Sequence, residues 1–139
     1  MSSRTFATRM TCFSLVSAIE TDVRRLLSNM NAVTQLDVPT DVRSNAESRY
    51  LSHFGEKIDP NAPLIDLIEF SDFSDLSKIL NKNRNTQTLV ESSTIQIIAS
   101  NLDSLVGARN RVCHSRPLEY NDINDFTDFS ASLKKIGES

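Results

Sequence analysis

Two side chains near the carboxyl-terminal end of the sequence have the types needed for chemistry at a phosphate group. Arg109 and His114 lie five positions apart, with Asn110 and Arg111 between them and Arg116 just beyond. Arginine keeps its charge at physiological pH, and its planar fork matches phosphate oxygens. Histidine titrates near neutral pH, so it can accept or donate a proton during catalysis. The segment therefore holds a charge stabiliser, a proton-transfer group and a polar neighbour.

These residues are expected at the end of a long helix. Apolar periodicity predicts that helix from about Leu89 to His114, and Pro117 stops it because the residue before a proline avoids helical angles. On a helical wheel, Arg109 lies near the middle of an apolar arc about 120° wide. The arc contains Ile95, Ile98, Leu102, Leu105, Val106, Arg109, Val112 and Cys113. A charge in an apolar stripe is costly unless it is paired or partly hydrated. Local departures of this kind tend to mark functional sites.

The spacing also limits what one chain can do. On a regular helix, Arg109 and His114 point about 140° apart, whereas Asn110 and His114 share a face. Convergence of Arg109 and His114 needs a frayed last turn, the reach of arginine, or a second copy. A plain structural interpretation stays open, because Arg109 can pair with a buried acid or extend to solvent. Arg111 and Arg116 can likewise serve the negative end of the helix dipole.

The rest of the chain is also predicted to be helical. The first helix is expected to pack one face carrying Phe6, Met10, Phe13, Val16, Ile19, Val23, Leu26, Met30 and Val33. A second helix is capped by Asp41 and ended by Gly55, and a loop follows over 55–63. The remaining predicted elements are a helix from Leu64 to about Leu80 with a kink where Ser71 or Ser74 can cap a restart, a polar connection over 81–88, and a last helix from Asn121 or Asp122 to Ile136. These elements predict an all-α antiparallel bundle of four to five helices.

Composition sets the wider limits. The 139 residues suit one domain over 1–139, although its origin in a longer protein stays open. The net charge of −3 excludes a generally basic surface, so nucleic-acid contact must be local. No apolar run is long enough to span a membrane, and no signal peptide is visible. Cys12 and Cys113 are expected to be reduced thiols in a cytoplasmic protein.

Other candidate sites are weaker. His53 is interpreted as a solvated histidine, and the adjacent Cys113 and His114 point about 100° apart, which disfavours a nucleophile pair. A zinc site built from Cys12, His53, Cys113 and His114 lacks ligand spacing. An acidic run is expected to serve the dipole of the last helix: Glu119, Asp122, Asp125 and Asp128. We therefore expect no metal and no cofactor.

The segment also resembles a known family. Arg109-Asn110-Arg111-Val112-Cys113-His114 is similar to the motif of the HEPN superfamily, which has arginine, a polar residue that is often asparagine, and a histidine after a short interval. The longer stretch over 105–118 resembles the sequence of some members, in which Arg-Asn-Arg is followed by His and then by Arg-Pro-Leu. The setting is similar too, since the motif ends a long helix and one more helix follows. The specific likeness covers 14 residues of the chain.

The resemblance implies a metal-independent endoribonuclease, in a defence, toxin or RNA-processing system, that works as a homodimer with its motif helices side by side. Arg109 and His114 would be the catalytic pair and Asn110 a supporting residue, with Arg111 and Arg116 contacting RNA. The ribose 2′-OH would be the nucleophile, so a 2′,3′-cyclic phosphate is the expected product. Arg116 stands where some toxin members carry a tyrosine that an antitoxin modifies, which weighs against that scheme.

Two other functions stay open. Some members of the family have lost catalysis, so a non-catalytic module for dimerisation or partner recruitment is the main alternative. A nucleotide-binding or nucleotidyl-transfer role has only the arginine cluster to support it. Further domains or a regulatory partner are compatible with either function.

Overall fold

The protein is all-helical over the part of the chain that the structure, a computed structural model, describes, residues 3–137. That range contains seven helices and no strand, which confirms the predicted all-α class. The helices are α1 (Ser3–Val33), α2 (Thr40–Phe54), α3 (Leu64–Ile68), α4 (Phe73–Asn83), α5 (Ser92–Ser104), α6 (Val106–Cys113) and α7 (Asp122–Gly137).

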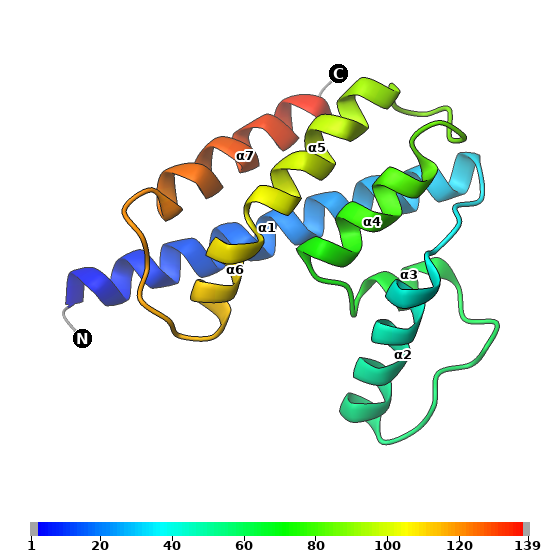
Figure 1. Cartoon of the computed structure of the whole chain (residues 1–139), viewed down its shortest axis with the longest axis horizontal. Coiled ribbons are helices and arrows are strands. Elements are labelled where there is room, and N and C mark those ends of the chain that lie inside the picture. The colour runs from blue at the N-terminus through cyan, green and yellow to red at the C-terminus, as the bar shows by residue number, and fades with distance from the viewer. Residues whose placement is uncertain (1–2, 138–139) are drawn as a thin grey trace.

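The long helix α1 is the spine of the molecule (Figure 1). The last helix, α7, lies along α1 and runs in the same direction, so their carboxyl-terminal ends line one groove. Helices α4 and α5 form an antiparallel pair beside them, and α6 continues α5 towards the start of α1. The antiparallel relation expected from the sequence is therefore seen between α4 and α5, whereas α1 and α7 are parallel.

The core forms where α1, α4, α5 and α7 meet. Helix α1 contributes buried side chains at three- and four-residue steps: Cys12, Val16, Ile19, Val23, Leu27 and Met30. Phe73 of α4 and Phe126 of α7 are fully buried against this face. The predicted face of α1 was wrong at its first turns, where Phe6, Met10 and Phe13 are 58%, 50% and 51% exposed. The apolar periodicity continues there, but no helix within residues 3–137 covers these three side chains.

The predicted helix from Leu64 to about Leu80 is two helices. A turn at 69–72 separates α3 from α4, and α4 continues to Asn83. The cap of α4 is Asp72, which corrects the prediction of Ser71 or Ser74. Asp72 accepts a hydrogen bond from the backbone N–H of Asp75 at 3.0 Å, and Asp75 accepts one from the backbone N–H of Asp72 at 3.2 Å. This reciprocal capping box satisfies two N–H groups at the helix start.

The predicted helix from Leu89 to His114 is also interrupted. Residues 89–91 are not helical, because the side-chain oxygen of Gln87 accepts the N–H groups of Leu89 and Val90 at 2.9 and 3.0 Å. Leu105, with φ −97° and ψ 1°, then separates α5 from α6. The apolar arc survives this break, since Leu105 and Val112 remain buried and Arg109 is half-buried.

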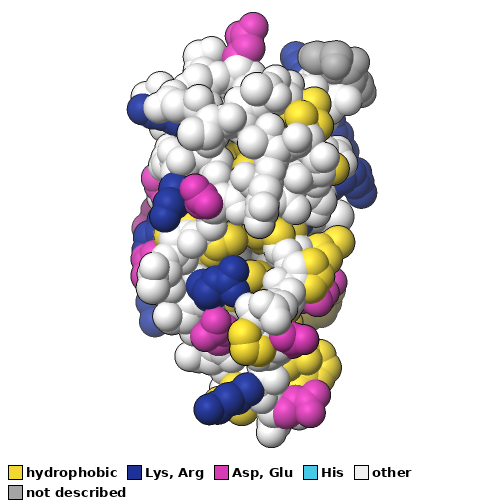
Figure 2. Space-filling model, turned by 90° about the vertical axis from the view of Figure 1, so that its right-hand side faces the viewer, with side chains coloured by type: hydrophobic (Ala, Val, Ile, Leu, Met, Phe, Trp, Pro, Cys, Tyr) yellow, Lys and Arg dark blue, Asp and Glu magenta, His cyan; other side chains and the backbone are white. Residues whose placement is uncertain are grey.

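Helices α2 and α3 form an arm that stands away from the bundle (Figure 1). Arg49 of α2 attaches the arm by donating to the carbonyl of Phe70 at 2.6 Å and to Asp75 at 2.5 Å. Gly55 ends α2 in the left-handed conformation, as predicted, whereas Asp41 makes no side-chain cap. Hydrophobic side chains gather on the lower half of the face in Figure 2, which carries this arm. Exposed apolar residues of the arm are Leu51, Phe54 and Ile65.

None of the helices in the described range combines the length and the apolar character that a membrane crossing requires.

Phe126 tests whether α7 closes the core. Its side chain is 0% exposed, so Phe126→Ala should lower the free energy of unfolding by about 3–5 kcal/mol. Tyr120, which is 94% exposed just before the same helix, gives the matched control, and Tyr120→Ala should change stability by less than about 0.5 kcal/mol. Urea unfolding followed by circular dichroism measures both. Equal effects would contradict the packing of α7 on α1.

Candidate functional site

The motif lies on α6 and the turn that follows it. His114 caps the carboxyl-terminal end of the helix, directly after Cys113, and its backbone N–H donates to the carbonyl of Asn110 at 2.9 Å. Ser115 then adopts φ 53°, and the N–H of Arg116 returns to the carbonyl of Arg111 at 2.9 Å. This is the hydrogen bond of a Schellman motif, which glycine usually ends. A serine in the left-handed region costs about 1–2 kcal/mol, so the turn is held by contacts elsewhere.

Arg9 of α1 supplies those contacts. Its guanidinium donates to the carbonyls of Arg111 at 3.1 Å and Val112 at 3.3 Å, and also to the carbonyl of Arg116. These carbonyls lie at the negative end of α6, where a cation is favoured. The start of α1 is thereby fixed against the end of α6. Sequence analysis missed Arg9, because its partners lie more than 100 positions away along the chain.

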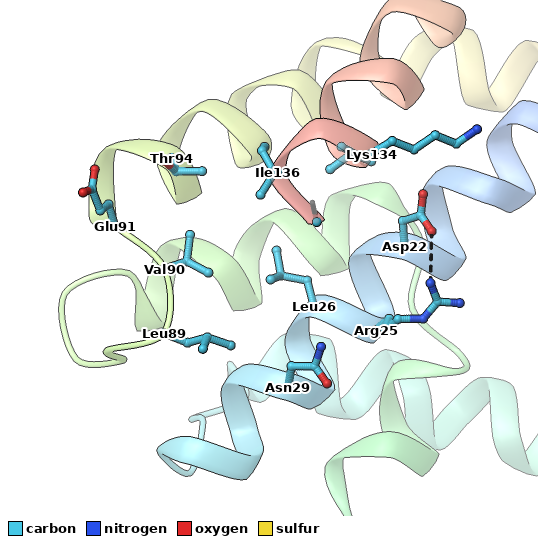
Figure 3. Close-up of a pocket in the computed structure, with 12 residues that line it drawn as sticks. Asp22, Arg25, Leu26, Asn29, Leu89, Val90, Glu91, Thr94, Lys134 and Ile136 are labelled. Atoms are coloured by element: carbon cyan, nitrogen blue, oxygen red, sulfur yellow. Dashed lines mark ion pairs between the residues drawn. The ribbon is translucent and has the colours of Figure 1, made fainter. Parts of the chain in front are cut away.

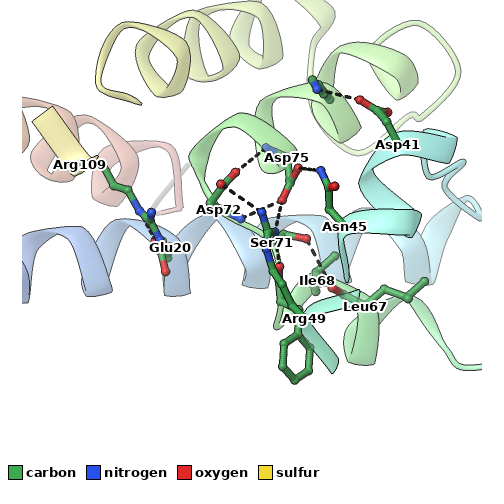
Figure 4. Close-up of polar contacts among 12 residues, drawn as sticks. Glu20, Asp41, Asn45, Arg49, Leu67, Ile68, Ser71, Asp72, Asp75 and Arg109 are labelled. Atoms are coloured by element: carbon green, nitrogen blue, oxygen red, sulfur yellow. Dashed lines mark hydrogen bonds and ion pairs between the residues drawn. The ribbon is translucent and has the colours of Figure 1, made fainter. Parts of the chain in front are cut away.

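Arg109 points from α6 towards α1, where it meets an acid. Its Nε lies 3.6 Å from Oε1 of Glu20, and the two side chains are 22% and 14% exposed (Figure 4). The pairing with a buried acid that the sequence left open is therefore the one the structure has. The distance exceeds that of a hydrogen bond, and Arg109 Nε and Glu20 Oε1 are both buried without a hydrogen-bond partner.

The two Nη atoms of Arg109 are not used in hydrogen bonds by the described residues, and neither is among the buried polar atoms that lack a partner. The Arg109 side chain is 22% exposed, so these atoms are not fully enclosed, while Nε faces Glu20. Two parallel N–H groups presented in this way match the oxygens of a phosphate.

Glu20 is held in turn by Arg24, one helical turn further along α1. The Glu20 Oε2 atom accepts from Arg24 Nη2 at 3.2 Å. Arg24 also donates to the carbonyl of Ile68 at 3.0 Å and to the carbonyl of Ser71 at 2.8 Å. A continuous polar chain thus runs from the turn between α3 and α4, through α1, to the motif arginine.

His114 and Asn110 are not joined to Arg109 within one chain. His114 is exposed and Asn110 is half-buried, and neither side chain has a hydrogen-bond partner in the described part of the chain. The guanidinium of Arg109 meanwhile faces α1. The angular separation expected from the sequence is thus preserved, and the structure brings no acid–base partner to His114.

The two remaining arginines differ from each other. Arg111 forms a bidentate pair with Asp122, with Nε–Oδ2 at 3.0 Å and Nη2–Oδ1 at 2.6 Å, so it ties α6 to the start of α7. The Asp122 carboxylate also accepts the backbone N–H of Glu119 at 2.9 Å. The hydrogen bond from Arg111 is the main reason that the pKa of Asp122 lies below its usual range. Arg116 is exposed, and its side chain has no partner within residues 3–137.

Both cysteines are free. Cys12 is buried in the core and Cys113 is half-buried beside the motif. Burial raises the pKa of both thiols, so neither is activated as a nucleophile. No group of three or more His, Cys, Asp or Glu side chains placed to hold a metal ion is found among residues 3–137.

A groove of about 750 Å³ lies at the other end of α1, away from the motif (Figure 3). Its apolar lining includes Leu26, Val90 and Ile136, and Arg25 and Lys134 stand at its rim. Arg25 is paired with Asp22 at 3.7 Å. The groove has no contact with the motif and contains no histidine or cysteine.

Comparison of the chain with protein-family models, with curated proteins and with solved structures finds no match in any of the three.

The ion pair of Arg111 and Asp122 makes the free energy of unfolding depend on pH. Because the pKa of Asp122 is lowered in the folded state, its contribution is complete above the ordinary aspartate value of 3.8 and is lost as the pH falls below it. Asp122→Asn should lower the free energy of unfolding by about 3 kcal/mol at pH 7, and should flatten the acid limb of the stability curve. Urea unfolding at several pH values measures both effects.

Asp125, which is exposed in the same first turn of α7, is the matched control. Asp125→Asn should cost less than about 1 kcal/mol, since it removes only a dipole interaction. A loss as large as that of Asp122→Asn would contradict the role assigned to the buried pair.

Proposed function

We propose that the chain is a HEPN-type endoribonuclease domain that cleaves RNA without a metal ion, at a cleft formed by two copies of α6. The observation that carries the proposal is the state of Arg109. Its guanidinium lies in an apolar stripe, is paired through Nε with Glu20 at 3.6 Å, and has two Nη atoms that make no hydrogen bond among the described residues. A purely structural arginine would be expected to use those atoms in hydrogen bonds, as Arg9 and Arg24 do.

The chemistry follows from the side chains present. The Nη edge of Arg109 would bind the scissile phosphate and stabilise the charge that builds on it. The exposed imidazole of His114 would transfer the proton of the 2′-OH or of the leaving 5′-oxygen. Asn110, one turn before His114, would orient the imidazole or the phosphate. The products would be a 2′,3′-cyclic phosphate and a free 5′-OH, and DNA would resist because it lacks the 2′-OH.

A second copy would complete the site. Arg109 and His114 of one chain point apart, but a two-fold axis along α6 would place the arginine of one copy beside the histidine of the other. Phe6, Met10 and Phe13 support this arrangement, because they form an exposed apolar strip on the turns of α1 that Arg9 fixes to the end of α6. An apolar strip beside a functional helix is typical of an interface.

The basic residues around the pair have different expected roles. Arg116 is exposed and unpaired within the described range, so it is the better candidate for contact with the RNA backbone. Arg111 is occupied by Asp122, so its substitution should act through stability. We place the domain in the cytoplasm, where the two free thiols would stay reduced.

A non-catalytic interaction module is the second candidate. It is favoured by the neutralisation of two motif arginines, Arg109 by Glu20 and Arg111 by Asp122. The arm of α2 and α3 also exposes apolar side chains, Leu51 and Phe54 among them, that a partner would cover. Binding to a partner would then survive the loss of His114, whereas cleavage of RNA would not.

The function is tested by incubating the purified protein with labelled single-stranded RNA in excess EDTA. The parent should cleave, and Arg109→Ala and His114→Ala should each lower the rate by about 10²-fold or more, because each removes one catalytic group. His53→Ala is the matched control, since His53 is the other histidine of the sequence and lies on α2. Gel electrophoresis with end-group analysis identifies the cyclic phosphate. Absence of cleavage by the parent would favour the interaction module.

Mixing two inactive variants tests whether the site is shared between copies. Half of the dimers in an equal mixture of Arg109→Ala and His114→Ala would contain one of each, and each mixed dimer would keep one intact site of two. The mixture should therefore regain about a quarter of the parent rate. No recovery, with exchange of subunits confirmed by light scattering and tagged pull-down, would contradict a shared site.

A further inference from the structure

We infer that Glu20 is a positioning residue for Arg109, and that Arg24 holds Glu20 in place for this purpose. The inference rests on the proposed function, because it names what aims the phosphate-binding edge of the motif arginine. Neither Glu20 nor Arg24 belongs to the motif, and both lie on α1, about 85 positions or more before it.

Arg24 is the fixed end of the chain of contacts. It donates to the carbonyl of Ile68, the last residue of α3, and to the carbonyl of Ser71 in the turn before α4. Its remaining contact, at 3.2 Å, is to Glu20 Oε2. With these acceptors Arg24 is anchored to the backbone at two points, so the carboxylate it binds has a defined direction.

Glu20 transmits this direction to Arg109. One carboxylate oxygen binds Arg24 and the other faces Arg109 Nε at 3.6 Å. Because the guanidinium is planar, holding Nε towards α1 limits the orientations of the two Nη atoms, which make no hydrogen bond among the described residues. The positive charge of Arg24 also offsets the negative charge of Glu20, so Arg109 keeps much of its attraction for a phosphate.

The pair is poorly built for stability alone. Glu20 Oε1 and Arg109 Nε are both buried without a hydrogen bond, which costs free energy at each atom. A half-buried ion pair of this kind is often no better than apolar side chains of similar size. The Nη atoms of Arg109 also have no hydrogen-bond partner among the described residues, which suits a side chain that binds a ligand.

The test compares Glu20→Gln with the parent enzyme in steady-state RNA cleavage in EDTA. Loss of the carboxylate charge should release the Nε edge and lower kcat about tenfold, because a small misplacement of a catalytic group is costly. KM should not rise, since removing an acid beside the cleft favours RNA. A merely structural defect would instead lower the melting temperature and the active fraction. Asp22→Asn, two positions further along α1 and paired with Arg25, is the matched control and should leave kcat unchanged.

A second readout does not depend on catalysis. The Nε–H signal of Arg109, assigned by its loss in Arg109→Lys, should show a rigid side chain in the parent and a mobile one in Glu20→Gln by heteronuclear relaxation. If Glu20→Gln does not fold, Glu20→Asp replaces it, because the shorter side chain keeps the charge but loses the reach to Arg109.

The outcomes distinguish failure of the inference about Glu20 from failure of the proposed ribonuclease function. A lower kcat together with a mobile Arg109 supports the inference. An active parent whose kcat is unchanged in Glu20→Gln, or an Arg109 that stays rigid, overturns the inference and leaves the ribonuclease function standing. If the parent cleaves RNA no faster than His114→Ala does, both the ribonuclease function and the inference about Glu20 are overturned.

Discussion

Glu20 on α1 is the charge around which the motif end of this protein is organised. A carboxylate that is 14% exposed needs cationic partners, and two arginines from opposite directions provide them. Arg24 connects it to the turn between α3 and α4, and Arg109 connects it to α6. One acidic side chain therefore relates three segments of the chain, and its electrostatic requirement sets where the motif arginine lies.

The helices were largely predictable from the sequence, whereas their interruptions were not. Gly55 ended its helix as predicted, because a left-handed residue at a helix end is a local signal. The break at Leu105 has no such signal, since no glycine or proline marks it. The cap of α4 was assigned to Ser71 or Ser74, whereas Asp72 between them forms the capping box with Asp75. The exposure of Phe13 could not be foreseen, because periodicity shows that a face is apolar and does not show what covers it.

The candidate site, like the helices, was only partly predictable from the sequence. The position of Arg109 in an apolar stripe was evident from helical spacing, and so was its angular separation from His114. Its partner Glu20 was not, because nothing in the sequence relates residues 89 positions apart on different helices. The same holds for Arg9, which caps α6, and for Asp122, whose acidic neighbours suggested a dipole role. Contacts between distant residues depend on packing, and packing is the part that local patterns leave undetermined.

The parallel relation of α1 and α7 has a consequence for how the chain is made. Helix α1 is synthesised before α7, so the apolar face of α1 must wait for residues 122–137. Helices α4 and α5, neighbours in sequence, can associate early, while the contacts of Phe126 close a loop of about a hundred residues. Until α7 has been synthesised, the nascent chain carries an unfinished core, and it is most vulnerable to aggregation or to chaperone capture during that interval.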